Sequence, residues 1–506
     1  MNKLTHETAS RAWNSVSGLR LRGPAAAVLA LFSALMFMQA SAQAPAQSAP
    51  AGASAKGVEL KGKVPVNPQT LRVQLPKPQE AVLSNGLRVS LLEDHKLPTF
   101  SMQLYFNGGG LADPEDKRGV AMVTASLLRE GTKKRSSREI AEQLATLGAG
   151  LSSSAGPASG ESVVSVTGLS DNVEPTLAIA SDVIRNPTFP AAELDKFRAR
   201  FLAQLQIQRA NPGFQAQEQF MRAIYGEHPG ALVVPSEAVI KGLSSADLAA
   251  FHSARYRPNN AFLIAHGDIT LKDLVARLER HFGDWAKADL TKVSLAQPKA
   301  PEKARVLLVD RPGSVQTSLW VGSMGIERNS DDYFAMLVMN HILGGGPASR
   351  LFMNLREDKG YTYGVYSSFT GTTFPGVVVA TTDVRTEVTE GAMQELNSEL
   401  QRIANEPVSE VELTNARRAL IGRFALSLDS PASLMGNLAT QKIYKLPADY
   451  WDTYPQRVAS ITPADIQRVA KKYYAPGRLQ IVAVGDAKQV NDVLKKYGTV
   501  EPVTPM

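Results

Sequence analysis

Residues 87–110 read LRVSLLEDHKLPTFSMQLYFNGGG, and residues 304–325 read ARVLLVDRPGSVQTSLWVGSMG. Each stretch begins with a β-rich apolar run that ends in an aspartate, Asp94 or Asp310. A turn follows, and then a second run of alternating apolar residues closes on glycine. Two such runs joined by a turn predict a β-hairpin, so the chain is expected to contain this unit twice.

A second pair of matching stretches lies further along the chain, at residues 255–285 and 472–498. Each contains an apolar strand, then Gly-Asp, then a helix with apolar residues at i, i+3 and i+4. Asp94 precedes Asp268 by 174 residues, and Asp310 precedes Asp486 by 176 (268 − 94 and 486 − 310). The nearly equal spacing predicts a duplicated α+β unit whose middle part is mainly helical.

The domain boundaries follow from this repeat and from changes in composition. We expect residues 66–286 to form the N-terminal half and residues 303–500 the C-terminal half. Residues 287–302 are polar and contain prolines, which is typical of a linker.

The N-terminus has the pattern of an export signal. Ala25–Met38 reads AAAVLALFSALMFM and is followed by Ala40-Ser41-Ala42, a small-x-small cleavage motif. These 14 apolar residues are fewer than the roughly 20 that span a bilayer. We expect residues 1–42 to be a signal peptide cleaved after Ala42, residues 43–65 to be a flexible spacer, and the mature protein to be periplasmic with no membrane span. An uncleaved N-terminal anchor is the alternative.

Composition excludes several kinds of site. The chain has no cysteine, which excludes disulfides, thiolate metal ligands and a cysteine nucleophile. The formal net charge is +7, and the expected signal peptide carries +3 of it (four Lys and Arg against Glu7), which leaves about +4. The chain has no basic run interleaved with aromatic residues, so a nucleic-acid partner is not expected.

Three stretches together resemble one known family. They are GVAMVTASLLREGT at 119–132, the segment from Gly226 to Ile269, and LGGGPASRLFMNLREDKGYTYGVYSSF at 343–369. Over residues 66–498 the chain is similar to the pitrilysin/insulinase (inverzincin) zinc metallopeptidases, in particular to the short-chain branch that includes mitochondrial processing peptidase. The resemblance implies an α+β fold of two tandem homologous α/β-sandwich halves that form one half of a clam-shell.

In that family an HxxEH helix binds zinc through its two histidines, and its glutamate acts as the general base. Met122, Ala125 and Ser126 stand at the corresponding positions here, and the third ligand position falls at Ala203 or Gln204. The zinc motif is therefore degenerate, and no metal or other cofactor is expected in this chain. The closest pair among its seven histidines is 14 residues apart, so no helix presents two of them one turn apart.

Arg356 and Tyr363 match a pair that reaches the catalytic cleft from the C-terminal half in the family. The resemblance implies that they hold the substrate carbonyl and stabilise the oxyanion. From the residues alone, an arginine near a helix end is commonly a partner of the helix dipole, and a strand tyrosine commonly packs. We expect a helix from about Pro347 to a stop at Gly360, then a strand with Tyr361, Tyr363 and Val365 on one face.

Two glycine-rich segments complete the pattern. Gly344-Gly345-Gly346 lacks the residues of a phosphate loop and is expected to permit close packing of a helix on a strand, or to flex. Residues 148–166 are expected to form an edge strand, of the kind to which peptides add in relatives.

Three functions are compatible with this sequence. The first is a non-catalytic subunit of a heterodimeric zinc metallopeptidase acting on peptides or unfolded segments, whose HxxEH-containing homologous partner supplies the zinc. The second is a catalytically inactive scaffold or assembly protein of the cell envelope. The third is a peptidase with an unrecognised site, including a metal site built from dispersed residues.

Overall fold

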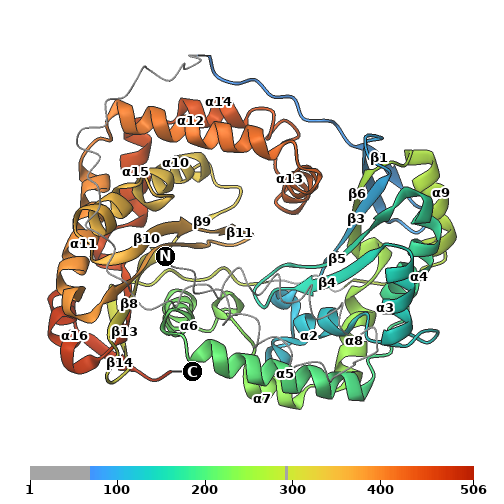
Figure 1. The fold of residues 1–506 in the computed structure, drawn as a ribbon, viewed down its shortest axis with the longest axis horizontal. Helices are drawn as coiled ribbons and strands as arrows, with labels where there is room; N and C mark the ends of the chain where they lie inside the picture. The colour runs from blue at the N-terminus through green and yellow to red at the C-terminus, as the bar shows by residue number, and fades with distance from the viewer. Residues whose placement is uncertain (1–68, 291–294, 506) are drawn as a thin grey trace, which may run out of the picture. The chain divides into compact units, whose positions relative to one another are not determined.

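The computed structural model describes residues 69–290 and 295–505, so the predicted signal peptide and spacer lie outside the described residues. The described chain contains two six-stranded sheets with helices packed on them (Figure 1). The predicted α+β fold is confirmed.

The first sheet is built from the N-terminal half and the second from the C-terminal half. In spatial order, the strands of the first sheet are β1 (Gln79–Val82), β2 (Arg88–Glu93), β6 (Ala261–Gly267), β3 (Thr99–Asn107), β5 (Glu161–Leu169) and β4 (Gly150–Ala155). Those of the second sheet are β10 (Thr362–Phe369), β12 (Val377–Arg385), β8 (Gln316–Met324), β13 (Gln480–Gly485), β7 (Arg305–Asp310) and β14 (Val500–Val503). A parallel pair, β9 (Ile326–Glu327) and β11 (Gly371–Thr372), stands apart.

Helices pack on both sheets. In the N-terminal half they are α2 (Val120–Leu127), α3 (Ser137–Thr146), α4 (Val173–Arg185), α5 (Ala191–Arg209), α6 (Pro212–Tyr225), α7 (Glu237–Gly242), α8 (Ser245–Arg255) and α9 (Leu271–Phe282). In the C-terminal half they are α10 (Tyr333–Gly344), the π-helix η6 (Phe352–Asp358), α11 (Thr389–Asn405), α12 (Glu410–Ser427), α13 (Pro431–Ile443), α14 (Tyr454–Ser460), α15 (Pro463–Tyr473) and α16 (Ala487–Leu494).

Five strands of each sheet correspond in order and direction, as the duplication predicts. The series β2-β6-β3-β5-β4 matches β7-β13-β8-β12-β10. The sixth strand differs, because β1 precedes β2 and pairs with it antiparallel, whereas β14 comes from the end of the chain and pairs with β7 in parallel. The repeat therefore covers five strands of each sheet, from β2 to the edge strand β4 and from β7 to the edge strand β10, and a different segment supplies the sixth strand of each sheet.

The predicted hairpins are wrong in one respect. The two strands of each stretch form, but β6 lies between β2 and β3, and β13 lies between β7 and β8. The inserted strands are buried along nearly their whole length, which favours a central place in the sheet. The short turn therefore joins strands that are not neighbours.

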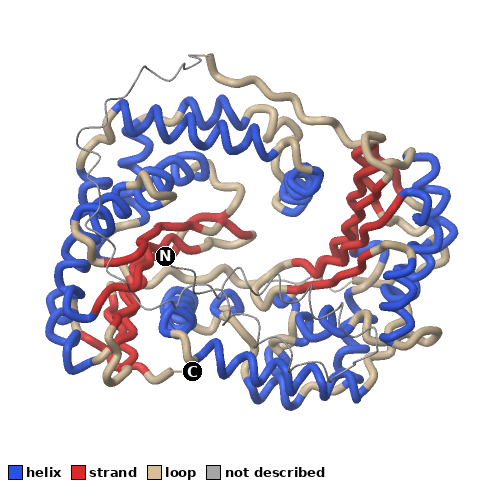
Figure 2. The backbone as a smooth tube through the Cα atoms, in the orientation of Figure 1, coloured by secondary structure: helices blue, strands red, loops and turns tan. Residues whose placement is uncertain are grey.

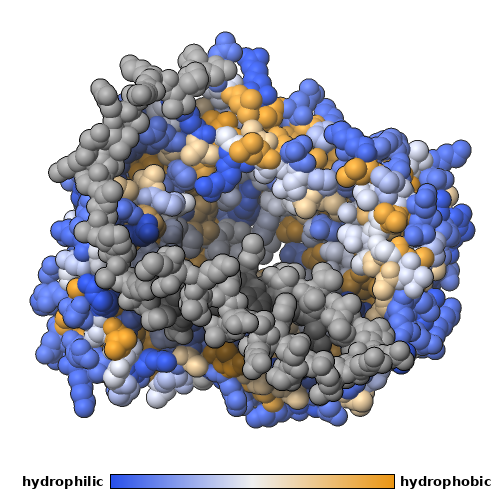
Figure 3. Space-filling model, in the orientation of Figure 1, coloured by the Kyte–Doolittle hydropathy of each residue, from blue (hydrophilic) through white to orange (hydrophobic). Residues whose placement is uncertain are grey.

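In each half, helices lie against the sheet (Figure 2). Each half has its own cluster of buried apolar side chains. Helix α9 shows the pattern: Leu274, Leu278 and Phe282 are buried, at i, i+4 and i+8. The outer side of α4 and α9 is mostly hydrophilic, at the right of Figure 3. Burial of one helical stripe is thus what holds these helices to the sheet.

Each half also packs one of its helices on the sheet of the other half. Helix α6 packs Ala216, Phe220 and Ile224 on the second sheet, where Phe220 lies 5.7 Å from the Trp320 ring. Its counterpart α13 packs on Tyr105, Phe262 and Ile264 of the first sheet, in a smaller cluster. Both helices begin with a proline, Pro212 or Pro431, at a position where the missing N–H costs nothing.

No helix within residues 69–290 and 295–505 is long and apolar enough to cross a membrane.

Candidate functional site

Arg356 lies on an uncommon helical segment. Residues Phe352–Asp358 form a π-helix, in which the Lys359 N–H donates to the Asn354 carbonyl over 3.0 Å. Gly360 ends it with φ of +64°, a conformation that glycine adopts without strain. The predicted stop at Gly360 is confirmed. The helix expected from about Pro347 begins at Arg350 and is a π-helix from Phe352 to Asp358, a form that recurs at functional sites.

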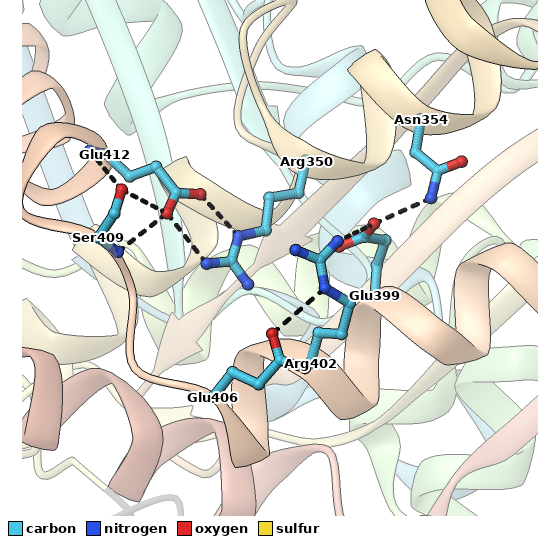
Figure 4. Close-up of polar contacts among 7 residues, drawn as sticks. All are labelled: Arg350, Asn354, Glu399, Arg402, Glu406, Ser409 and Glu412. Atoms are coloured by element: carbon cyan, nitrogen blue, oxygen red, sulfur yellow. Dashed lines mark hydrogen bonds and ion pairs between the residues drawn. The ribbon is translucent and has the colours of Figure 1, made fainter.

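Polar side chains tie this segment to the two long helices behind it (Figure 4). Arg350, just before the π-helix, donates two hydrogen bonds to Glu412 of α12, at 2.8 and 3.1 Å. Asn354 donates to Glu395 at 3.0 Å and to Glu399 at 2.9 Å, both on α11. The backbone that leads into Arg356 is therefore held to both α11 and α12.

The paired charges of Arg350 and Glu412 also change the acidity of the carboxyl group. The Arg350 guanidinium lowers the pKa of Glu412 to about 2, helped by the backbone N–H of Ser409. Ser409 and Glu412 form a capping box at the start of α12, so one carboxylate both caps that helix and holds Arg350.

Tyr363 differs from the expectation. The strand was expected to place Tyr361, Tyr363 and Val365 on one face, but Tyr363 is 91% exposed and Val365 is fully buried. The pairing of β10 with β12 shifts register between Thr362 and Val365, which turns Tyr363 out of the alternation. The Thr362 hydroxyl holds this bulge by donating to the Asp383 carbonyl at 2.7 Å.

The structure brings Arg356 and Tyr363 together. The Arg356 guanidinium lies 5.4 Å from the centre of the Tyr363 ring and 4.7 Å from that of Phe352. One of its nitrogens pairs with Glu357 at 2.7 Å. A guanidinium and a phenol, both open to solvent and set side by side, can donate hydrogen bonds to one oxygen on which negative charge develops.

The degenerate motif lies on α2. Ala125 is fully buried, Met122 is half-buried and Ser126 is exposed. The Ser126 hydroxyl donates to the Met122 carbonyl at 2.8 Å, four residues back on the same helix. A thioether, a methyl group and a hydroxyl engaged by its own helix do not fit zinc, which takes imidazole, thiolate or carboxylate ligands.

The third ligand position gives the same result. Ala203 and Gln204 are both exposed on α5, and neither carries a group that binds zinc. In the described part of the chain, no three histidine or acidic side chains gather in a way that could hold a metal ion. The residues present do not fit the family's metal.

The glycine-rich and edge segments are placed as follows. Residues 148–166 form two strands, and of these β4 alone lies at the edge of the sheet. The Ser153 hydroxyl of β4 donates to the Ala125 carbonyl at 2.5 Å, so this edge runs beside the degenerate motif. A Cβ at Gly344 would lie 2.2 Å from the Ser367 nitrogen, which confirms the close packing expected of a helix on a strand.

Sequence reasoning missed Arg350 and Asn354. They lie six and two residues before Arg356, and their polarity on the inner side of a helix could have marked them. It also missed the bulge, for which the strand sequence shows only Gly364 as a cue.

Comparisons with known proteins identify relatives over most of the chain. The family model for the insulinase peptidases (family M16) matches residues 88–234. The model for the peptidase M16 inactive domain matches residues 242–420. The two models together extend from β2 to α12.

Individual relatives agree with these models. An uncharacterized zinc protease of Mycobacterium tuberculosis is 26% identical over 375 residues, 72% of this chain and 84% of the relative. A solved peptidase M16 inactive domain from Pseudomonas fluorescens is 30% identical, with a TM-score of 0.75 over 81% of this chain and 98% of the other. The periplasmic protease PqqL from Escherichia coli, 17% identical, shares the fold with a TM-score of 0.70 over 92% of this chain and 51% of its own.

Proposed function

This chain belongs to peptidase family M16, the insulinase family, and we propose that it is a non-catalytic subunit of a heterodimeric zinc metallopeptidase. The partner is a homologue that carries HxxEH and zinc, and the substrates are peptides or unfolded segments. The observation that carries the proposal is a contrast between two sites. No zinc ligand remains on α2, whereas Arg356, on a helical segment bonded to α11 and α12, lies beside Tyr363.

This chain contributes binding and charge stabilisation. Arg356 and the Tyr363 hydroxyl donate hydrogen bonds to the carbonyl oxygen of the peptide bond as it gains negative charge. The bonds of Arg350 to α12 and of Asn354 to α11 hold the helical segment that carries Arg356, so little movement of its backbone is needed when charge develops. Removing one such donor lowers the rate by about 100-fold or more in well-formed oxyanion sites.

The location follows from the N-terminal sequence. Ala25–Met38 and Ala40-Ser41-Ala42 support export and cleavage, and the subunit therefore acts in the periplasm with its partner.

The test is hydrolysis of an unstructured peptide by this chain mixed with the HxxEH-bearing homologue from the same genome. Tyr363→Phe removes one hydroxyl from an exposed ring, so it leaves folding unchanged and should slow cleavage at least tenfold. Tyr366→Phe is the matched control, because Tyr366 lies on the same strand and is 46% exposed. Equal rates for the two variants would refute the role of Tyr363 and favour the inactive scaffold.

A further inference from the structure

The duplication allows the degenerate motif to be located a second time, in the C-terminal half. The Ser153 hydroxyl of edge strand β4 donates to the Ala125 carbonyl, and the Ser367 hydroxyl of the corresponding edge strand β10 donates to the Asn340 carbonyl at 3.3 Å. Asn340 on α10 therefore corresponds to Ala125 on α2. By the same register, His341 corresponds to Ser126, the second metal position.

The third position can be found in the same way. Helices α5 and α12 correspond, and each is followed by a helix that starts with proline. Gln204 lies eight residues before Pro212, and Arg423 lies eight residues before Pro431 (212 − 204 and 431 − 423). The C-terminal half thus has a histidine and an arginine where a catalytic N-terminal half has metal ligands.

These two side chains line one cavity. It has a volume of 330 Å³, within the range of small-ligand sites, and lies between the end of α10, the residues after it, and α12. Three of its polar groups lack partners: within the part of the chain that the structure describes, no hydrogen bond or ion pair engages the His341 ring, the Ser349 hydroxyl or the Arg423 guanidinium. Ser349 is only 3% exposed, so its free hydroxyl faces no bulk water.

The charges around the cavity favour a single negative charge. Burial, together with the nearby Arg423, lowers the pKa of His341, so at neutral pH its ring is uncharged and donates one N–H. Glu412 also lines the cavity, but its carboxylate is engaged by Arg350 and Ser409 (Figure 4). Asn415 adds a neutral amide. One unpaired cation with three neutral polar groups matches a carboxylate, while the remaining wall is apolar: Ile342, Pro347, Ala348, Ala416 and Ala419.

We propose that this cavity binds the C-terminal carboxylate of a short peptide, with Arg423, Ser349 and His341 on the carboxylate and the apolar wall against the last side chain. The proposal rests on the proposed function in that it takes peptides as ligands. It gives the duplicated motif a binding role in the half of the molecule where zinc has no counterpart.

The test is isothermal titration calorimetry on the complete mature chain without its partner, with tetra-alanine as the probe. C-terminally amidated tetra-alanine lacks the charge and should bind about 10- to 100-fold more weakly, which is the worth of a charge-assisted hydrogen bond. Arg423→Gln should weaken tetra-alanine binding by a similar factor. Arg418→Gln is the matched control, because Arg418 is also an exposed arginine on α12 but does not line the cavity.

Each other outcome overturns the proposal. Undetectable binding of tetra-alanine, equal binding of the two peptides, or equal effects of the two arginine variants would show that no carboxylate site is present. Displacement of tetra-alanine by an equal concentration of acetate would assign the cavity to free carboxylic acids instead of peptides. Hydrolysis by the two-subunit mixture tests the proposed function separately, since this titration needs no partner and no cleavage.

Discussion

The pairing of Arg350 with Glu412 gives a prediction whose size can be worked out. Glu412→Gln keeps a side chain that serves in a capping box and removes only the charge that Arg350 needs. The pKa of Glu412 falls from 4.5 to about 2, a change that corresponds to about 3 kcal/mol before screening. Glu412 is 35% exposed and Arg350 10%, so screening by water reduces this to about 2 kcal/mol.

The pH dependence gives the sign. The pKa of Glu412 is lower in the folded chain, so its contribution is complete above pH 4.5 and is lost as the pH falls towards 2. Urea denaturation followed by tryptophan fluorescence should therefore show a loss of about 2 kcal/mol for Glu412→Gln at pH 7, and less than half of that difference at about pH 3. Glu139→Gln is the matched control, since Glu139 holds the same place in the capping box of α3 without a bidentate arginine. Equal losses for the two variants, or a loss that does not change with pH, would show that the charge of Glu412 on Arg350 does not stabilise the fold.

Two further predictions concern the packing between the halves and the protonation of one buried histidine. Phe220→Ala removes a fully buried ring between α6 and the second sheet, so it should lower the free energy of unfolding in urea by about 3–5 kcal/mol. Leu438→Ala, in the smaller cluster between α13 and the first sheet, should lower it by less. The reverse order would contradict the packing of these two helices. Burial lowers the pKa of His252 from 6.5 to about 4. Acidification from pH 7 to pH 4 should therefore lower the free energy of unfolding by up to about 3 kcal/mol, because only the unfolded state takes up the proton. In the same assay, His252→Phe should lose about 3 kcal/mol less than the original chain between pH 7 and pH 4. A variant that follows the original pH profile would show that His252 does not titrate there.

The duplicated architecture could be predicted from the sequence because matching apolar runs recur in both halves. Strand runs ending at Asp94 and Asp310 and the Gly-Asp turns at Asp268 and Asp486 have a period that survives divergence. Strand order could not be read in this way. A hairpin of β2 and β3 and a sheet with β6 between them have the same local pattern, and the choice depends on burial of β6 on both faces.

The candidate site was predicted in part. The identities of Arg356 and Tyr363 came from the family resemblance, and the stop at Gly360 from local backbone preference. The exposure of Tyr363 could not be predicted, because one bulged residue reverses which face a strand side chain occupies. Nor could the cavity at His341 and Arg423, which depends on aligning the halves through hydrogen bonds of their edge strands.

The most direct test of the central claim is to measure zinc content and peptide hydrolysis for the purified mature chain alone, for the HxxEH-bearing homologue alone, and for their mixture. We expect no stoichiometric zinc and no hydrolysis for this chain by itself. We expect the mixture to cleave faster than the homologue alone, with a rate that depends on Arg356. Stoichiometric zinc and hydrolysis in this chain by itself would contradict the conclusion drawn from Met122, Ala125 and Ser126.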